Sequence, residues 1–162
     1  MCSCNGLNRR RFLGLLPGAA AALSLAGCFD KGSGPGEIRW GKEYCTYCGM
    51  IIDDPRFAAQ IRGGAGRKLA KFDDLGDAVL WLAKQPFADD PATEFWVGDV
   101  EKSVWLDGRT AWYLSGRKSP MAHNFGAVPD QRPGAIGFAE LKRVILERGS
   151  TSRCETPEQG ST

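Results

Sequence analysis

The chain has 162 residues, with 21 lysines and arginines, 19 aspartates and glutamates and a single histidine, so its formal net charge is +2. This length is enough for one domain with a hydrophobic core of its own. Residues 1–27 hold three arginines and no acidic residue, and without them the balance is 18 basic against 19 acidic residues. No basic face is therefore expected, which argues against a nucleic-acid-binding protein.

The first 27 residues have the order of a bacterial export signal. Residues 8–13 read NRRRFL, a twin-arginine pattern, and a leucine- and alanine-rich run follows to Gly27. The run ends in LAGC at residues 25–28, the pattern of a lipoprotein cleavage site, and it is too short and interrupted for a membrane-spanning helix. We predict a cleaved signal peptide over residues 1–27 and a lipid on Cys28, which would anchor the protein on the periplasmic side of a bacterial membrane.

The rest of the chain divides by composition. Residues 28–36 are small and glycine-rich, and they predict a flexible tether between the lipid and the domain. Residues 150–162 are polar, contain Cys154 and predict a disordered tail. The folded domain is therefore expected over residues 37–149.

The first half of this domain predicts a hairpin, a helix and a strand. Residues 57–62 and 68–72 flank the glycine-rich turn at 63–66, as the two strands of a hairpin do. A helix follows, for which Asp73 or Asp74 can supply the N-cap. Its apolar positions have helical spacing and are Leu75, Ala78, Val79 and Leu82.

The second half predicts the same kinds of element. After a strand at 94–97, residues 104–106 and 111–114 flank Asp107-Gly108, which is a strong signal for a second hairpin. A second helix is expected from about Phe138. The fold class is therefore α+β, with an order that hints at two similar small halves.

The segment at residues 45–50 reads CTYCGM and brings two thiols and a thioether within six residues. Thiolates and thioethers are soft donors, and Cu(I) is the metal that prefers them. Gly49 lets the backbone turn so that the sulfurs of Cys48 and Met50 can face one point. A c-type haem site would need histidine at position 49, and a zinc knuckle would need a second cysteine pair.

A second segment offers further soft or imidazole ligands. Met121 and His123 lie two residues apart in a loop between Pro120 and Gly126, and His123 is the chain's only histidine. Cu(I) accepts imidazole beside sulfur, so both side chains are candidate ligands. The plainer alternative for His123 is a hydrogen-bonding role in the core or at the surface.

These segments together resemble the NosL family, the copper-binding lipoproteins that accompany nitrous-oxide reductase. The likeness rests on CTYCGMII at residues 45–52 after a lipoprotein signal, KFDD at 71–74, AWY at 111–113 and Pro120-Met121. It covers nearly the whole mature domain, and Cys-Gly-Met is its most specific part. It implies a monomer with a two-part ββαβ-type fold, similar to that of organomercurial lyase.

The resemblance also implies a ligand set and partners. Cys48 and Met50 match the metal ligands of the family's Cys-Gly-Met pattern, while Cys45 precedes that pattern. The implied role is copper supply to nitrous-oxide reductase, with the membrane-bound assembly proteins of that enzyme as further partners.

The sequence thus predicts a membrane-tethered, extracytoplasmic Cu(I) metallochaperone rather than an enzyme. Its candidate ligands are Cys48, Met50, His123, Cys45 and Met121. The alternative is a thiol-dependent enzyme, either a relative of organomercurial lyase or a dithiol oxidoreductase. Such an enzyme would use Cys45 and Cys48 as a pair and would not need Met50.

Overall fold

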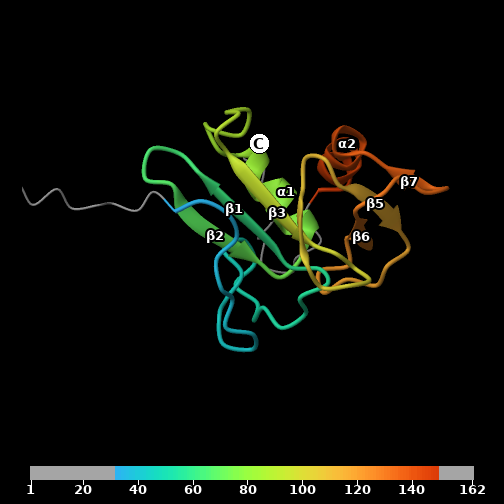
Figure 1. Cartoon of the computed structure of the whole chain (residues 1–162), viewed down its shortest axis with the longest axis horizontal. Helices are drawn as coiled ribbons and strands as arrows, with labels where there is room; N and C mark the ends of the chain where they lie inside the picture. The colour runs from blue at the N-terminus through green and yellow to red at the C-terminus, as the bar shows by residue number, and fades with distance from the viewer. Residues whose placement is uncertain (1–31, 150–162) are drawn as a thin grey trace, which may run out of the picture. The chain divides into compact units, whose positions relative to one another are not determined.

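The computed structural model describes residues 32–149, which form two antiparallel sheets and two helices (Figure 1). This confirms the α+β class. The signal peptide at 1–27, the predicted lipid site Cys28 and the tail at 150–162 with Cys154 lie outside the described residues. The elements are β1 (Ala59–Gly63), β2 (Lys68–Phe72), α1 (Leu75–Ala83), β3 (Glu94–Gly98), β4 (Trp105–Asp107), β5 (Trp112–Ser115), β6 (Phe125–Val128), β7 (Ala135–Ile136) and α2 (Phe138–Arg148).

The first sheet has the strand order β2-β1-β3-β4, and its first two strands are the predicted hairpin. Side chains alternate between the two faces of a strand, so one face carries Ile61, Phe72 and Val97. All three are fully buried, and this face packs on α1, which lies behind the sheet in Figure 1. The main core of the domain therefore lies between this sheet and α1.

Helix α1 begins where the sequence predicts. The Asp74 carboxylate accepts a hydrogen bond from the backbone N–H of Gly76 (2.9 Å), which is the N-cap geometry. The four apolar residues with helical spacing are all buried. No helix within residues 32–149 combines the length and the apolar character needed to cross a membrane.

The prediction of a second hairpin is wrong. Both of its strands exist, but β4 pairs with β3, whereas β5 is the central strand of a second sheet with the order β6-β5-β7. The Asp107 carbonyl accepts hydrogen bonds from the N–H groups of Thr110 (3.2 Å) and Ala111 (2.9 Å). This wider turn replaces the two-residue turn of a tight hairpin, so the chain leaves one sheet and enters the other.

The loop predicted around Met121 and His123 ends earlier than expected, because strand β6 already begins at Phe125. All four residues of β6 are buried, so the strand lacks the alternation of polar and apolar residues that identifies a half-exposed strand. An isolated parallel bridge joins Asp99, which directly follows β3, to Ala127 of β6.

The other face of the first sheet is covered by the start of the described chain. The backbone N–H of Gly36 donates to Gln60 Oε1 (2.8 Å), and Gln60 Nε2 donates back to the Gly36 carbonyl (2.9 Å). The N–H of Gly34 donates to a carboxylate oxygen of Glu94 (2.7 Å). The tether predicted for residues 28–36 is therefore held on the sheet from Gly34 onward.

Residues 41–52 fold back on themselves as a hairpin-like segment that we call the thiol arm. The N–H of Gly41 donates to the carbonyl of Ile52 (2.8 Å), and the N–H of Ile52 donates to the carbonyl of Glu43 (2.9 Å). Tyr44 and Ile51 form an antiparallel bridge in the middle of the arm. The CTYCGM segment is consequently the closed end of a hairpin-like structure.

Candidate metal centre

The closed end of the thiol arm turns both cysteines inward. The N–H of Cys45 donates to the Met50 carbonyl (2.7 Å), and the N–H of Gly49 donates back to the Cys45 carbonyl (3.0 Å). Gly49 has a φ of +75°, a left-handed conformation that glycine adopts without a steric penalty. Cys45 and Cys48 are buried free thiols, whereas Met50 is 54% exposed.

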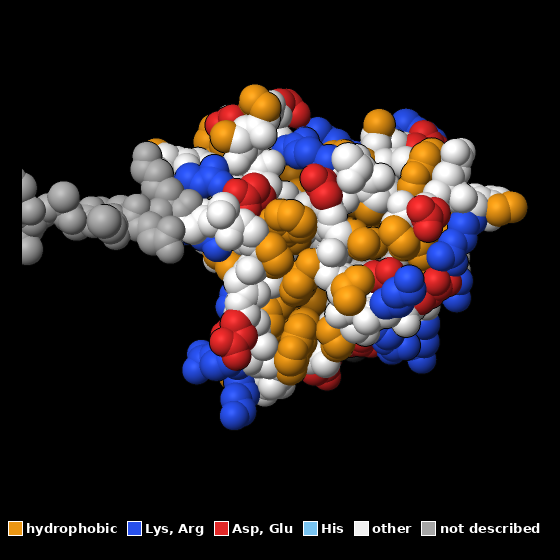
Figure 2. Space-filling model, viewed as in Figure 1, with side chains coloured by type: hydrophobic (Ala, Val, Ile, Leu, Met, Phe, Trp, Pro, Cys, Tyr) orange, Lys and Arg blue, Asp and Glu red, His pale blue; other side chains and the backbone are white. Residues whose placement is uncertain are grey.

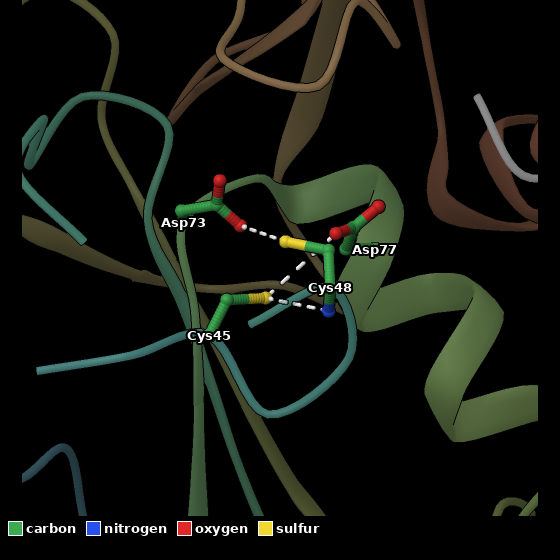
Figure 3. Close-up of side chains that lie close together, drawn as sticks. All are labelled: Cys45, Cys48, Asp73 and Asp77. Atoms are coloured by element: carbon green, nitrogen blue, oxygen red, sulfur yellow. Dashed lines mark hydrogen bonds between the residues drawn. The ribbon is translucent and has the colours of Figure 1, made fainter. Parts of the chain in front are cut away.

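Two carboxylates from another part of the chain meet these thiols. Asp73 directly follows β2 and Asp77 lies in the first turn of α1, so the turn from strand to helix brings both carboxylates to the thiols. Cys48 Sγ donates to Asp73 Oδ1 (3.4 Å) and Cys45 Sγ donates to Asp77 Oδ2 (3.7 Å). Figure 3 shows the four side chains pointing toward one another, and one possible ligand atom from each lies within 4.8 Å of the others.

The buried position of this cluster keeps its thiols protonated. Burial raises the pKa of the Cys45 thiol to about 11, and it also raises the pKa of the Cys48 thiol. Burial raises the pKa of the Asp73 carboxyl as well. A metal ion that binds the thiols must therefore displace their protons, and each thiol already donates to a carboxylate that can receive one.

His123 lies behind the cluster rather than among the thiols. Its Nε2 is 3.0 Å from Asp77 Oδ1, so Asp77 contacts Cys45 with one oxygen and His123 with the other. The imidazole is buried, and its Nδ1 has no hydrogen-bond partner among the described residues. The ring packs against Gly76, where an added Cβ would lie 2.2 Å from His123 Cγ. Only glycine at position 76 leaves room for this histidine.

Asp74 fastens the Met121 loop to the start of α1. Besides capping the helix, its carboxylate accepts hydrogen bonds from Ser119 Oγ (2.6 Å) and from the Met121 N–H (3.0 Å). Burial raises the pKa of this carboxyl. Residues 73–77 thus connect the two parts of the site. Asp73 contacts the thiol cluster, Asp74 binds the Met121 loop, and Asp77 contacts both a thiol and His123 of that loop.

The two predicted thioether ligands meet at an opening beside the cluster. Met50 and Met121 line a surface pocket of about 420 Å³ together with Asp73. Asp73 also contacts Cys48, so it connects this open pocket with the buried thiols. The structure therefore places the five predicted ligands in three positions: two thiols inside, two thioethers at the opening and His123 behind Asp77.

The arrangement offers a metal ion two kinds of donor. Two thiolates are sufficient to hold Cu(I), and the thioethers at the opening are also soft. Asp73 and Asp77 add oxygen donors that complete a four-ligand set of the kind borderline divalent ions accept. The buried cluster alone is therefore less selective for Cu(I) than a purely sulfur site.

Sequence reasoning missed Asp73 and Asp77 as members of the site. It interpreted Asp73 only as a possible helix cap, a role that Asp74 takes, and it gave no role to Asp77. The available signal was Asp77 alone, which lies in the first turn of the predicted helix between the apolar positions Leu75 and Ala78. An aspartate on the buried face of a helix usually has a partner, and here the partners are thiols.

No protein-family model matches the chain, and a search of curated proteins also finds no match. Among solved structures, the chain is similar to the copper chaperone NosL from Shewanella denitrificans, with 17% identity and a TM-score of 0.50. The match covers 70% of this chain and 87% of that one. At this identity the likeness establishes the fold, and the prediction of a NosL-like fold is confirmed.

Proposed function

We propose that the protein is a membrane-anchored, extracytoplasmic Cu(I) metallochaperone that supplies copper for the assembly of nitrous-oxide reductase. The observation that carries the copper-binding part is the buried pair Cys45 and Cys48, which lies beside an opening lined by Met50 and Met121. The NosL-like fold supports the same role. The lipid on Cys28, the periplasmic location and the reductase as acceptor are part of the proposal and come from the sequence.

The arrangement suits a protein that must hold copper and then release it. The two thiols provide tight binding in a largely buried site. The thioethers of Met50 and Met121 bind more weakly and stand at the solvent side. An acceptor ligand that approaches this opening can replace one protein ligand at a time, so copper moves by ligand exchange and is never free.

Competition with a coloured Cu(I) chelator, bathocuproine disulfonate, tests the binding site. Cys45→Ser and Cys48→Ser should each lower the Cu(I) affinity at least a hundredfold, and Met50→Ile should lower it less, by about tenfold. Cys154→Ser is the matched thiol control and should have no effect. Unchanged affinity in Cys48→Ser would rule out the thiol pair as the copper site.

One observation favours an enzyme as the second candidate. Asp73 has a raised pKa and contacts Cys48 at 3.4 Å, so a proton donor stands beside a thiol pair. An activity like that of organomercurial lyase would use the thiols to hold mercury and this proton to release the carbon group. Benzene release from phenylmercury acetate is the assay, and its absence would remove this candidate. A dithiol oxidoreductase fits less well, because its reactive thiol needs a lowered pKa.

A further inference from the structure

Most of the exposed apolar side chains of the described domain are concentrated at the thiol arm. Six large hydrophobic side chains are exposed within residues 32–149, and four of them belong to the arm or directly precede it. They are Trp40 (40% exposed), Tyr44 (66%), Met50 (54%) and Ile51 (47%). Single exposed apolar residues are ordinary, but a group of them on one short segment marks an interaction surface.

This group is continuous with the opening of the metal centre. Tyr44 and Ile51 are bridge partners, so their side chains project from the same side of the arm. Ile51 and Met50 both line the pocket that Asp73 connects to the thiols. Figure 2 shows a band of apolar side chains on this face of the molecule, and the band extends down to the region where Figure 1 places the arm. A partner that covers the patch therefore also covers the opening.

Basic side chains border the patch beside Tyr44. A depression of about 500 Å³ is lined by Arg39, Lys42 and Lys71, with Glu43 as its only acidic residue. Glu43 is shared between Lys71 (2.6 Å) and Arg39 (3.0 Å), and Lys42 has no ion pair among the described residues. Figure 2 shows basic side chains at the lower left corner of this view. The border of the patch beside Tyr44 is thus net positive.

We propose that the thiol arm is the surface on which a folded acceptor protein docks, and that the acceptor presents an apolar centre with an acidic border. The inference rests on the proposed delivery function and adds the partner's recognition chemistry. Two hollows flank the arm, which suits the relief of a protein better than a flat bilayer. An acceptor must also bring metal ligands to the opening, and a lipid surface has none to offer.

Transfer kinetics test this assignment with the Cu(I)-loaded full-length protein. Copper-depleted nitrous-oxide reductase serves as the protein acceptor, and bathocuproine disulfonate serves as a small acceptor that needs no docking surface. Tyr44→Ser and Trp40→Ser remove exposed side chains that do not line the opening. The matched controls are Val104→Ser and Leu146→Ser, which remove exposed side chains away from the arm.

We expect Tyr44→Ser to slow transfer to the reductase about tenfold, as truncation of a large aromatic interface residue commonly does. Removal by the chelator should stay within about twofold for every variant, and added salt should slow wild-type transfer to the reductase because the border attraction is screened. Faster loss to the chelator from Tyr44→Ser would overturn the proposal, since the variant would then have damaged the site itself.

Three other outcomes would also overturn it. If Tyr44→Ser and the controls transfer to the reductase at equal rates, the surface assignment fails while the delivery function stands. If wild-type protein delivers no copper to the reductase, both the delivery function and the proposed docking surface are refuted. If Tyr44→Ser transfers normally but loses binding to phosphatidylglycerol vesicles, or loses self-association in sedimentation, the arm contacts a membrane or a second copy instead.

Discussion

Replacing Gly76 by alanine should weaken the domain although alanine is the better helix former. Propensity alone would stabilise α1 by about 1 kcal/mol. The new Cβ, however, would lie 2.2 Å from Cγ and 2.4 Å from Cδ2 of the His123 ring, which is buried and held by Asp77. Overpacking of this kind costs about 1–3 kcal/mol, and a broken buried hydrogen bond costs about 1–3 kcal/mol more. The expected net loss is about 3 kcal/mol.

Urea denaturation of the metal-free protein measures this loss, and a double-mutant cycle identifies its cause. In a His123→Gly background both the ring and the His123 Cβ, which would lie 2.6 Å from the new Cβ, are gone, so Gly76→Ala should cost nothing or stabilise by up to about 1 kcal/mol. Gly66→Ala is the control, because its Cβ would meet only Lys68 Cγ at 3.9 Å. An equal cost of Gly76→Ala in both backgrounds, or a gain in the wild-type background, would refute the packing argument.

The remaining predictions concern titration, the Asp74 contacts, anchoring and delivery. The pKa of the Cys45 thiol is raised from 9.0 to about 11, so the unfolded chain loses this proton first and the metal-free protein should lose stability between about pH 9 and 11. A urea midpoint of wild type that does not change with pH over that range, or one that falls equally in Cys45→Ser, would contradict this. Asp74→Asn should cost about 1–3 kcal/mol of unfolding free energy, because an amide has one acceptor oxygen and cannot serve both the helix cap and the two donors of the Met121 loop. Asp53→Asn, at an exposed loop position, should cost less than about 0.5 kcal/mol. Cys28→Ser should leave an uncleaved precursor, while wild-type protein should partition into detergent; wild type found wholly in the aqueous phase would rule out the lipid. Deletion of the gene should leave an exported reductase short of copper, which excess copper partly corrects; full copper content under limitation would end the delivery proposal.

Local patterns were sufficient for the elements whose determinants are close in sequence. The hairpin of β1 and β2 follows from two apolar runs around residues 63–66, and α1 follows from a capping aspartate ahead of residues with helical spacing. The second hairpin failed because Asp107-Gly108 specifies a turn but not the partner of each strand. The partner of each strand depends on which sheet has an unpaired edge, and β4 pairs with the open edge of β3.

The candidate site also has features that the local sequence predicts and features that it does not. CTYCGM by itself predicted a soft metal site, since the donor atoms belong to the residue types and glycine permits the turn. It did not reveal that Cys45 and Cys48 point inward while Met50 points out. That difference depends on which side of the arm the sheet and α1 cover.

Sequence alone therefore determined the chemical nature of the protein: its α+β class, its soft donors and the outline of the first hairpin and helix. Tertiary structure alone decided that Asp73 and Asp77 face the thiols, that His123 supports Asp77 from behind, and that the exposed apolar side chains border the opening. The physical reason is separation along the chain. Donor chemistry and local turns are properties of neighbouring residues, whereas a contact between Cys45 and Asp77 exists only once the core has packed α1 against the arm.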